Sequence, residues 1–325
     1  DTATTEIYTP SLHDALPISS TQNTTMQSEE IDTGLTINAV CSLGDGTVAV
    51  GGLYTGEISI YSIETKERIG KFIGHTGSVC CLKLLPNNRL LSGGFDSPSI
   101  LWDIPSRTII SRFQGHENAV RDICVLRNGT HFISGSQDRT MKLWNLDSGQ
   151  CERIFRGHDN YLFSVLELLD GRILSGSADK TIKVWNPDSE TCQATWEGLN
   201  DGVSSLIELE DGRVVSGSWD NTIRVWDAST GLCTRTIRGH ENTVSCLYVL
   251  SNGFIISGST ENALKIWDLS NEDDAGCQVM TLEGHNNRIS SVIQLEDGRI
   301  VSGSWDYTIR IWNIDDILPM NFILK

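Results

Sequence analysis

The sequence lacks long hydrophobic runs and has little positive charge. No apolar segment in its 325 residues approaches the roughly 20 residues that a helix needs to cross a bilayer. Lys and Arg number 25 against 42 Asp and Glu, which gives a formal net charge of −17. Nucleic acids and anionic membranes bind cationic surfaces, because phosphates must be paired and counterions released. We therefore expect neither a nucleic acid nor a membrane as a partner.

The sequence also lacks the pattern of a disulfide framework or of a metal site. Of its nine cysteines, Cys151, Cys192 and Cys233 each follow a regularly spaced tryptophan by seven residues. Equivalent positions of a repeat lie too far apart for a disulfide, which needs Cα atoms about 5.5 Å apart. We expect buried, reduced thiols, as in an intracellular, cytoplasmic protein, and the same argument would hold in the nucleus. No cysteine and histidine spacing resembles a zinc site, so we expect no metal and no cofactor.

The beginning of the chain differs in character from the rest. Residues 1–20 lack the basic start and the continuous apolar core of a signal peptide. They look like translated adapter sequence, so we interpret residues 1–25 as a non-native or disordered leader and Met26 as the natural start. Residues 26–34 are then a short N-terminal segment before the first repeat.

Six tryptophans recur at intervals of 41 to 45 residues and form the strongest pattern in the chain. Each has a serine ten residues before it and an acid six residues before it, and five repeats add an upstream Gly-His pair. A period of about 40–45 residues is typical of β-propeller blades. The members of this recurrent network are His75, Ser92, Asp96, Trp102, His116, Ser134, Asp138, Trp144, His158, Ser175, Asp179, Trp185, Ser216, Asp220, Trp226, His240, Ser257, Glu261, Trp267, His285, Ser302, Asp306 and Trp312.

Turn signals between the tryptophans predict four strands in each repeat. In the repeat of Trp226 the predicted strands are Val203–Leu209, Arg213–Ser218, Ile223–Asp227 and Cys233–Ile237. The Asp211-Gly212 pair between the first two favours a tight hairpin, and seven such hairpins along the chain predict seven blades. The first repeat is divergent, with Tyr61 in place of tryptophan and no Gly-His pair. The expected blades are 35–73, 75–113, 116–155, 158–196, 199–237, 240–282 and 285–323, within a propeller domain of residues 35–325.

These repeats resemble the WD-repeat family over about residues 35–323, and the Trp-Asp pair itself occurs at Trp102, Trp226 and Trp267. The resemblance implies an all-β fold, a seven-bladed β-propeller of four-stranded antiparallel blades. It also implies that the first strand of each blade lines a central channel. The Gly-His pairs and the acid-bearing turns would lie on one face, the top.

The end of the chain bears on how the ring closes. An apolar residue follows most repeat aromatics by eleven positions, and the same rule applied to Trp312 selects Ile323. This predicts that Leu318–Leu324 supplies the fourth strand of the last blade. Many family members close the ring with an N-terminal strand instead, but nothing in Gln22–Gly34 resembles such a strand.

The recurrence of His, Ser and Asp resembles a hydrolase triad only in composition. A catalytic triad is needed once, whereas this set recurs in most repeats, with Glu261 as the acid in one and Leu199 replacing histidine in another. A buried indole N–H needs an acceptor; serine can accept it while donating to histidine, and the acid binds the other ring nitrogen. We therefore interpret the network as structural and expect no enzymatic activity.

Departures from the repeat mark the candidate partner-binding site. In the family, the residue before the turn acid and the residue that starts the inner strand face the top. Aromatic residues and arginines are enriched at binding hot spots, and arginine can clamp carboxylate or phosphate. The alternatives are that the rings merely cover strand ends and that the arginines are ordinary solvated charges. The candidate residues are Phe95, Arg121, Tyr161, Phe163, Trp219, Arg288, Trp305 and Asn38.

Three functional hypotheses follow. The first is a non-catalytic scaffold, a monomeric propeller that binds other proteins or peptides on its top face. The second is a substrate receptor of a ubiquitin ligase that reads phosphopeptides, because the repeats resemble those of F-box/WD-repeat receptors; Met26 to Leu35 leaves no room for an F-box. The third is an enzyme with a metal or cofactor on the channel axis, for which the residues that start the inner strands are a poor ligand set.

Overall fold

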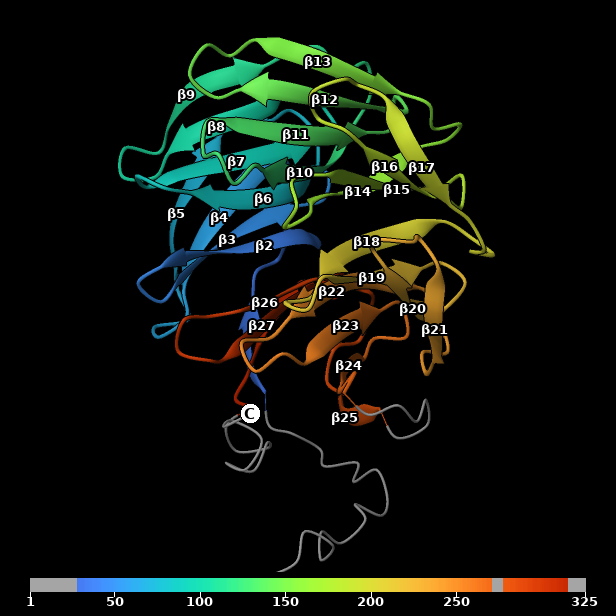
Figure 1. The fold of residues 1–325 in the computed structure, drawn as a ribbon. Helices are drawn as coiled ribbons and strands as arrows, with labels where there is room; N and C mark the ends of the chain where they lie inside the picture. The colour runs from blue at the N-terminus through green and yellow to red at the C-terminus, as the bar shows by residue number, and fades with distance from the viewer. Residues whose placement is uncertain (1–27, 271–276, 315–325) are drawn as a thin grey trace, which may run out of the picture.

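The computed structural model describes residues 28–270 and 277–314, and within them every regular element is a strand. The 28 strands form seven four-stranded antiparallel sheets arranged around a central axis (Figure 1). The expected seven-bladed β-propeller is therefore confirmed.

The blades follow one another along the chain, and in six of them the order of the strands in the sheet is the order in the sequence. The first three consist of β2 (Ile37–Gly44), β3 (Thr47–Gly52), β4 (Glu57–Ser62) and β5 (Arg68–Ile73); β6 (Val79–Leu85), β7 (Arg89–Gly94), β8 (Ser99–Asp103) and β9 (Thr108–Phe113); and β10 (Val120–Val125), β11 (His131–Ser136), β12 (Thr140–Asn145) and β13 (Cys151–Arg156). The next three consist of β14 (Leu162–Glu167), β15 (Ile173–Ser177), β16 (Ile182–Trp185) and β17 (Cys192–Trp196); β18 (Val203–Glu208), β19 (Arg213–Ser218), β20 (Thr222–Asp227) and β21 (Cys233–Arg238); and β22 (Val244–Val249), β23 (Ile255–Ser259), β24 (Leu264–Trp267) and β25 (Gln278–Leu282). The seventh combines β26 (Ile289–Gln294), β27 (Ile300–Ser304) and β28 (Thr308–Trp312) with β1 (Glu29–Asp32).

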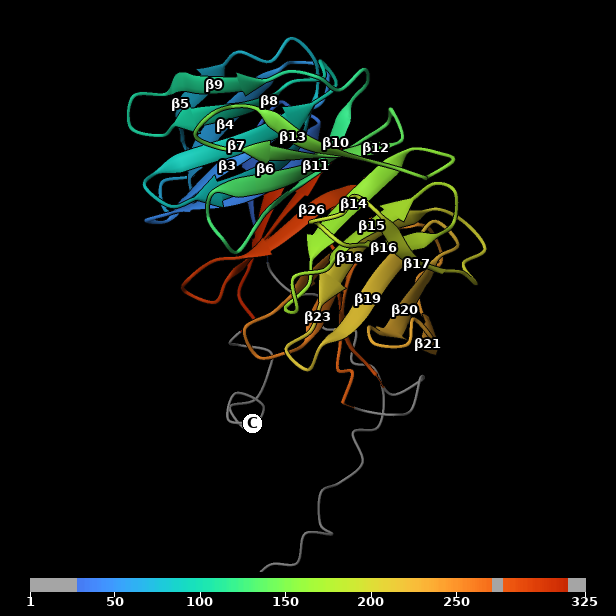
Figure 2. The ribbon, with the colours of Figure 1, turned by 45° about the horizontal axis from the view of Figure 1, so that its top comes forward.

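The first strand of each blade lies nearest the axis and the fourth lies at the periphery (Figure 2). Hairpin chemistry explains why the chain turns where it does. Asn87 and Asn88 both have positive φ, 62° and 53°, a conformation that asparagine tolerates better than other side chains. At Gly212 φ is 82°, where glycine avoids the clash of a Cβ atom.

The hydrophobic core lies between the blades. Seven clusters of buried side chains occur, and each combines residues of two adjacent blades. One of them joins Trp226 and Val203 of the fifth blade to Leu174 and Trp196 of the fourth. Gly176 allows this close approach, because a Cβ atom there would lie 2.6 Å from Val203 Cγ1. Each blade is therefore stabilised by its neighbours, as expected of a repeat that cannot bury its apolar face alone.

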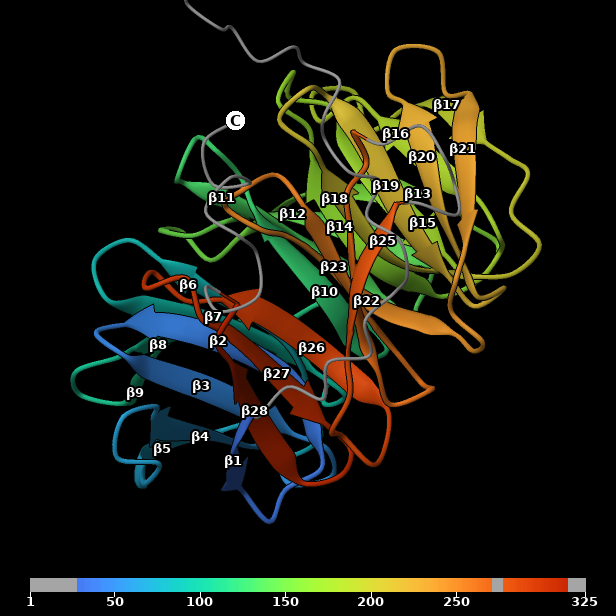
Figure 3. The same ribbon diagram turned by 90° about the horizontal axis from the view of Figure 1, so that it is seen from below.

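The predicted ring closure by Leu318–Leu324 is wrong. Those residues lie outside the described part of the chain, but the free edge of β28 is occupied by β1, with Ile31 opposite Ile309 (Figure 3). Ile31 is 3% exposed and packs in the cluster between the seventh and first blades, whereas its three companions in β1 are exposed. Glu29–Asp32, within the segment that we expected to precede the propeller, thus supplies a strand to it.

Composition explains why β1 has no recognisable pattern. As an outermost strand it buries a single side chain. It is otherwise held to the propeller by backbone pairing with β28 and by ion pairs. Glu30 accepts from Arg310 at 2.5 Å, and Glu29 pairs with Lys66 at 3.2 Å. Four residues with one apolar member show neither the alternation nor the β-branched richness that indicates a strand. The closure could therefore not be recognised from local sequence.

The cysteines are free, but three of them are not buried as expected. Cys151, Cys192 and Cys233 are exposed, whereas Cys41, Cys81 and Cys277 are buried and the other three are half-buried. The exposed ones begin the peripheral strands β13, β17 and β21, where the pairing register shifts beside the repeat tryptophan. Among the described residues no further strand pairs with the outer edges of β13, β17 and β21, so these side chains reach solvent. The expectation of burial was wrong for these three.

Candidate functional site

The recurrent network is a four-residue hydrogen-bonded unit, here called the tetrad. In the third blade, Trp144 Nε1 donates to Ser134 Oγ at 2.8 Å, and His116 Nε2 lies 2.7 Å from the same oxygen. His116 Nδ1 lies 2.7 Å from Asp138 Oδ2. Since the carboxylate can only accept, Nδ1 carries the proton and Nε2 accepts from the serine hydroxyl. Ser134 is 0% exposed, so its hydroxyl cannot meet a substrate.

The same geometry recurs in four other blades. The histidine–acid distances lie between 2.6 and 2.8 Å across the five. The tetrads of the remaining four are His75, Ser92, Asp96 and Trp102; His158, Ser175, Asp179 and Trp185; His240, Ser257, Glu261 and Trp267; and His285, Ser302, Asp306 and Trp312. The acid also accepts from the backbone N–H after the histidine, as Asp179 does from Asp159 at 3.1 Å. Each tetrad thus joins strands two and three of a blade to the loop that enters it.

The fifth blade builds the unit without histidine. Trp226 Nε1 donates to Ser216 at 2.9 Å, and Arg224 Nη1 donates to Asp220 Oδ2 at 2.7 Å. Arg224 is only 4% exposed, and its guanidinium supplies the hydrogen-bond donor that the imidazole supplies elsewhere. Sequence reasoning recognised Leu199 in the histidine position but missed Arg224. The available signal was a basic residue four positions after the turn acid.

Hydrogen bonding and charge control the titration of the tetrad acids. Burial alone would raise their pKa, but the bond from the imidazole and its charge outweigh burial. The pKa of Glu261 is lowered to about 2, and those of Asp138, Asp179 and Asp306 are lowered well below their usual range. Burial lowers the pKa of His240, and the hydrogen bond to Glu261 offsets this effect only in part.

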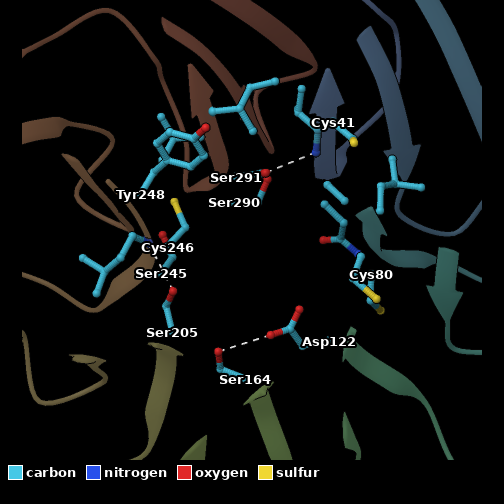
Figure 4. A pocket seen from close by; sticks show the side chains of 18 of the residues that line it. Cys41, Cys80, Asp122, Ser164, Ser205, Ser245, Cys246, Tyr248, Ser290 and Ser291 are labelled. Carbon is cyan, nitrogen blue, oxygen red and sulfur yellow. Dashed lines mark hydrogen bonds between the residues drawn. The ribbon is translucent and has the colours of Figure 1, made fainter. Parts of the chain in front are cut away.

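A cavity of about 480 Å³ occupies the channel and is lined by residues of all seven blades. Figure 4 shows side chains from the inner strands, among them Cys80, Asp122, Ser245 and Ser290, surrounding this space. Five of the eight sequence-predicted site residues line the cavity: Asn38, Arg121, Phe163, Trp219 and Arg288. Phe95 contacts Arg121, and Trp305 contacts Arg288 and Asn38, so the structure brings seven of the eight together.

Four of these residues form a continuous row that we call the long stack, namely Phe95, Arg121, Phe163 and Trp219. The guanidinium carbon of Arg121 lies 5.4 Å from the ring centroid of Phe95 and 5.0 Å from that of Phe163. Phe163 in turn meets Trp219 edge to face, with centroids 4.8 Å apart. Cation–π and edge-to-face contacts of this kind each contribute about 0.5–1.5 kcal/mol. The row crosses four blades, from the second to the fifth.

Three residues form a second group, the short stack, across the seam between the seventh and first blades. The guanidinium carbon of Arg288 lies 5.0 Å from the ring centroid of Trp305. Trp305 Nε1 donates to Asn38 Oδ1 at 3.3 Å. Asn38 and Arg288 line the same cavity as the long stack, so the two stacks flank one opening.

Trp219 lies beside an exceptionally small neighbour. Its backbone N–H donates to Gly202 O at 2.9 Å, and a Cβ atom on Gly202 would lie 2.8 Å from the indole ring. In the seventh blade the equivalent residue is Arg288, whose side chain covers Trp305 instead. Both tryptophans are therefore held in place and half-buried, with part of each ring left open to solvent.

Tyr161 is the predicted site residue that the structure sets apart. It is 43% exposed and lines a separate groove between the third and fourth blades, together with Gln137, Glu117 and Asp159. Sequence reasoning missed Tyr54, which is 84% exposed. Tyr54 precedes Tyr61 by seven residues, the interval that separates Trp219 from Trp226, so the signal was present but the divergent first blade hid it.

The residue that follows the first position of each inner strand has one of two roles. In the fifth to seventh blades it is a serine that donates to the backbone of the next blade, as Ser204 does to Val244 O at 2.6 Å and Ser290 to Ile37 O at 2.5 Å. Ser245 bonds to Ile289 O in the same way. In the first four blades the position is instead Asn38, Cys80, Arg121 and Phe163, all of which line the cavity.

Below this level Asp122 belongs to the framework. Its carboxylate accepts from Val165 N at 3.0 Å and from Ser164 Oγ at 3.2 Å, both in the next blade. Burial raises its pKa, which Lys83 and these hydrogen bonds partly offset.

Among the described residues no group of His, Cys, Asp and Glu has the geometry to hold a metal ion. Nor does that part of the chain contain a helix with the length and hydrophobicity that a membrane crossing requires.

Six segments match the family model described as WD domain, G-beta repeat, at residues 66–103, 107–145, 149–186, 190–227, 231–268 and 276–313. The chain belongs to this WD40 family. Each matched segment ends at the residue after a repeat tryptophan. The matches therefore take in the fourth strand of one blade and the first three of the next, which is how a WD40 repeat is offset from a propeller blade.

Relatives of this WD40 chain match it over short stretches. It is 36% identical to the U3 small nucleolar RNA-associated protein 15 homolog of Gallus gallus over 91 residues, 27% of this chain and 18% of that protein. It is 39% identical over 82 residues to WD repeat and FYVE domain-containing protein 1 of Mus musculus, 23% and 20% of the two chains. A guanine nucleotide-binding protein beta-1 subunit of Homarus americanus is 33% identical over 85 residues, 25% of each. The matches thus span a quarter or less of these relatives.

The fold has a much more extensive likeness among solved structures. The crystal structure of the WD40 β-propeller domain of Doa1 superposes with a TM-score of 0.77 at 25% sequence identity. The superposition covers 89% of this chain and 96% of that domain. The architecture is therefore shared over almost the whole propeller.

Proposed function

We propose that this WD40 propeller is a non-catalytic interaction module that binds a protein partner or a peptide segment on its top face. The observation that carries the proposal is the convergence of the long and short stacks on one opening. Their tryptophans, Trp219 and Trp305, are large side chains held rigidly at a solvent-facing surface. Rigid aromatic residues beside arginine are the composition of binding hot spots, because they offer large contact area at little entropic cost.

Two further observations support an interaction role over catalysis. The Ser–His–acid sets are engaged in the framework, with the serine hydroxyls buried. One relative is named as a subunit of a guanine nucleotide-binding protein, and so is part of an assembly. The serines and histidines of these sets thus hold together the strands and entering loop of each blade, and the variable residues at the mouth are left to contact a partner.

The test is a double substitution, Trp219→Ala with Trp305→Ala. Proteins that the wild-type propeller captures from cells are identified by mass spectrometry, and each is then titrated, as purified protein, against both forms. We expect at least a tenfold loss of affinity, because each ring supplies an anchor worth about 2 kcal/mol or more at a hot spot. The two indoles are half-buried at the surface, so we expect a small change in the melting temperature.

A matched control uses the opposite face. Leu169 and Leu232 are 54% and 66% exposed in bottom-face turns of the fourth and fifth blades. Leu169→Ala with Leu232→Ala removes comparable exposed apolar area, and we expect binding to be retained. Equal partner affinity in the wild type and the double tryptophan variant, both folded, would show that the top face is not the docking surface.

A further inference from the structure

We infer that Arg121 and Arg288 form a two-arginine anion subsite at the channel mouth that binds the phosphate of a phosphorylated peptide side chain. This inference rests on the proposed function, since it names the chemistry that the top-face site recognises. The two arginines belong to the third and seventh blades and line the same cavity. Neither forms an ion pair with a carboxylate in the described part of the chain, although acids outnumber bases in this protein.

Both guanidinium groups have unused donors. Nε of Arg121 and Nε of Arg288 are buried without a hydrogen-bond acceptor. Within the described residues, the side-chain hydrogen bond of Arg121 is a long one, from Nη1 to Cys80 Sγ at 3.6 Å, and the guanidinium of Arg288 has none. A buried charged donor without an acceptor destabilises a fold by about 1–3 kcal/mol or more. An anion at the mouth would remove that penalty.

Aromatic rings hold the two guanidinium groups in place without accepting hydrogen bonds from their N–H groups. Phe95 and Phe163 lie against the guanidinium of Arg121, and Trp305 lies against that of Arg288. Stacking occupies the faces of a planar guanidinium and leaves its N–H edges available. Those edges are the part of arginine that makes paired hydrogen bonds with phosphate or carboxylate. The arrangement is therefore preorganised for an oxyanion.

The local charge is opposite in sign to that of the molecule. The cavity lining holds three cations, Arg121, Arg288 and Lys83, and one carboxylate, Asp122, which is bonded to the backbone of the next blade. Burial and, next, the charge of Arg121 lower the pKa of Arg288, so the two cations repel each other across the mouth. A monoanionic carboxylate would leave one of the two arginines uncompensated. A phosphate, with a charge of about −1.5 to −2 near pH 7, matches the pair.

The contacts between neighbouring blades show that the position of Arg121, the second residue of the innermost strand, is free to serve a ligand. In three blades its counterparts, Ser204, Ser245 and Ser290, bond the neighbouring blade and contribute to the framework. Arg121 occupies the same position and makes no such bond. A framework role thus exists for this position, and Arg121 does not perform it.

The test measures peptide binding by fluorescence anisotropy. The probes are nonapeptide libraries with random flanks and a central phosphothreonine, threonine or aspartate, titrated with the full chain. We expect phosphothreonine peptides to bind at least tenfold more tightly than the other two. Arg121→Gln and Arg288→Gln should each abolish this preference, whereas Arg213→Gln, in a bottom-face turn where Arg213 pairs with Asp211 at 2.7 Å, should retain it.

Stability provides a readout that a structural arginine would not share. Removing an unpaired, mutually repelling charge should leave the melting temperature of the ligand-free Arg121→Gln and Arg288→Gln variants unchanged or raise it. A clear fall in both would assign the arginines to the framework and overturn the inference. Equal binding of phosphorylated and unphosphorylated peptides would overturn it as well.

The design separates this inference from the proposed function. Trp219→Ala with Trp305→Ala should weaken phosphorylated and unphosphorylated peptides alike, so a tryptophan effect without a phosphate effect refutes only the anion subsite. If no library peptide binds, inorganic phosphate is titrated at constant ionic strength. A rise in melting temperature that both glutamine variants lack supports the subsite, and no rise, or an equal rise in the variants, refutes it.

Discussion

At the scale of single residues, one buried hydroxyl joins the parts of each tetrad. Ser134 accepts from the indole of Trp144 and donates to His116, so a single oxygen satisfies two ring nitrogens. The acid then holds the other nitrogen and the entering loop. Every polar atom of the unit has a partner, which is the condition under which a buried polar network stabilises a fold.

The tetrad acids predict how stability depends on pH. Because the pKa of Glu261 is about 2 in the folded state and about 4.3 in an unfolded chain, its stabilising effect is complete above about pH 4.3 and is lost as pH falls toward 2. Glu261→Gln should lower the free energy of unfolding at pH 7 by about 2 kcal/mol, the worth of a hydrogen bond to a charged group. The deficit relative to wild type should shrink on acidification, as measured by urea unfolding from pH 7 to about pH 3.

The control for this prediction is Glu283→Gln, which alters an exposed acid near the same blade and should change little at any pH. A deficit for Glu261→Gln that stays constant down to pH 3 would mean that the carboxylate is not stabilised by its tetrad. The pKa values of the acids in the four other tetrads shift in the same direction, so the wild type should itself lose stability over this pH range.

Residue spacing predicted the tetrads well and the exceptions poorly. His116, Ser134 and Asp138 were recognisable because each repeat places them at the same intervals. Arg224 was not, because a basic residue four positions after the turn acid occurs in most repeats, and in the sixth blade Lys265 pairs with Glu261 beside a histidine. Repetition reveals what every blade needs, and a substitution unique to one blade becomes interpretable only from contacts.

At the scale of secondary-structure elements, the short strand β1 closes the ring. It adds four residues to an edge, yet it joins the two ends of a ring whose blades otherwise follow in sequence. Its single buried side chain packs between the seventh and first blades with Tyr61 and Ile309. The seam between the two ends of the propeller therefore depends on Ile31.

Ile31→Ala tests this role. Removing a buried isoleucine side chain typically lowers the free energy of unfolding by about 2–5 kcal/mol, and we expect a loss of at least about 2 kcal/mol here. Glu29→Ala is the control, since Glu29 is 59% exposed and its surface ion pair should contribute no more than about 1 kcal/mol. Urea unfolding followed by tryptophan fluorescence measures both. An effect of Ile31→Ala no larger than that of the control would mean that β1 does not stabilise the closed ring.

Strand prediction succeeded where apolar and polar residues alternate along the strand, and it failed where they do not. The strands β18 to β21 begin and end within one residue of their predicted bounds, because apolar alternation and hairpin turns mark them. The edge strand β1 exposes three of its four residues and has no such marking. Its place is decided by backbone pairing with β28, a partner about 280 residues away.

At the scale of the whole molecule, seven equivalent sheets produce an unequal top face. The framework repeats around the ring, while the long and short stacks occur once each and converge on the channel mouth. The mouth is cationic within a protein of net charge −17. A uniform scaffold thus presents one chemically distinct surface.

The net charge predicts the response to salt. Like charges on a compact protein repel one another, and salt screens them, with a Debye length of about 10 Å at 0.1 M falling to about 3 Å at 1 M. Raising NaCl from about 0.05 to 0.5 M at pH 7 should therefore raise the melting temperature. Differential scanning fluorimetry measures this, and KCl should act equally if screening is the cause. A fall in melting temperature would mean that attractive surface pairs outweigh the repulsion.

The sequence by itself determined the blade count, the tetrads and the turns, because each is built within one repeat of about 40 residues from neighbours along the chain. Tertiary structure alone decided how the ring closes and which variable residues meet. Arg121, Phe163 and Trp219 come from three blades and share no local pattern, and the curvature of the closed ring brings them together. Contacts within a repeat are encoded by spacing, whereas contacts across the axis depend on the geometry of all seven blades.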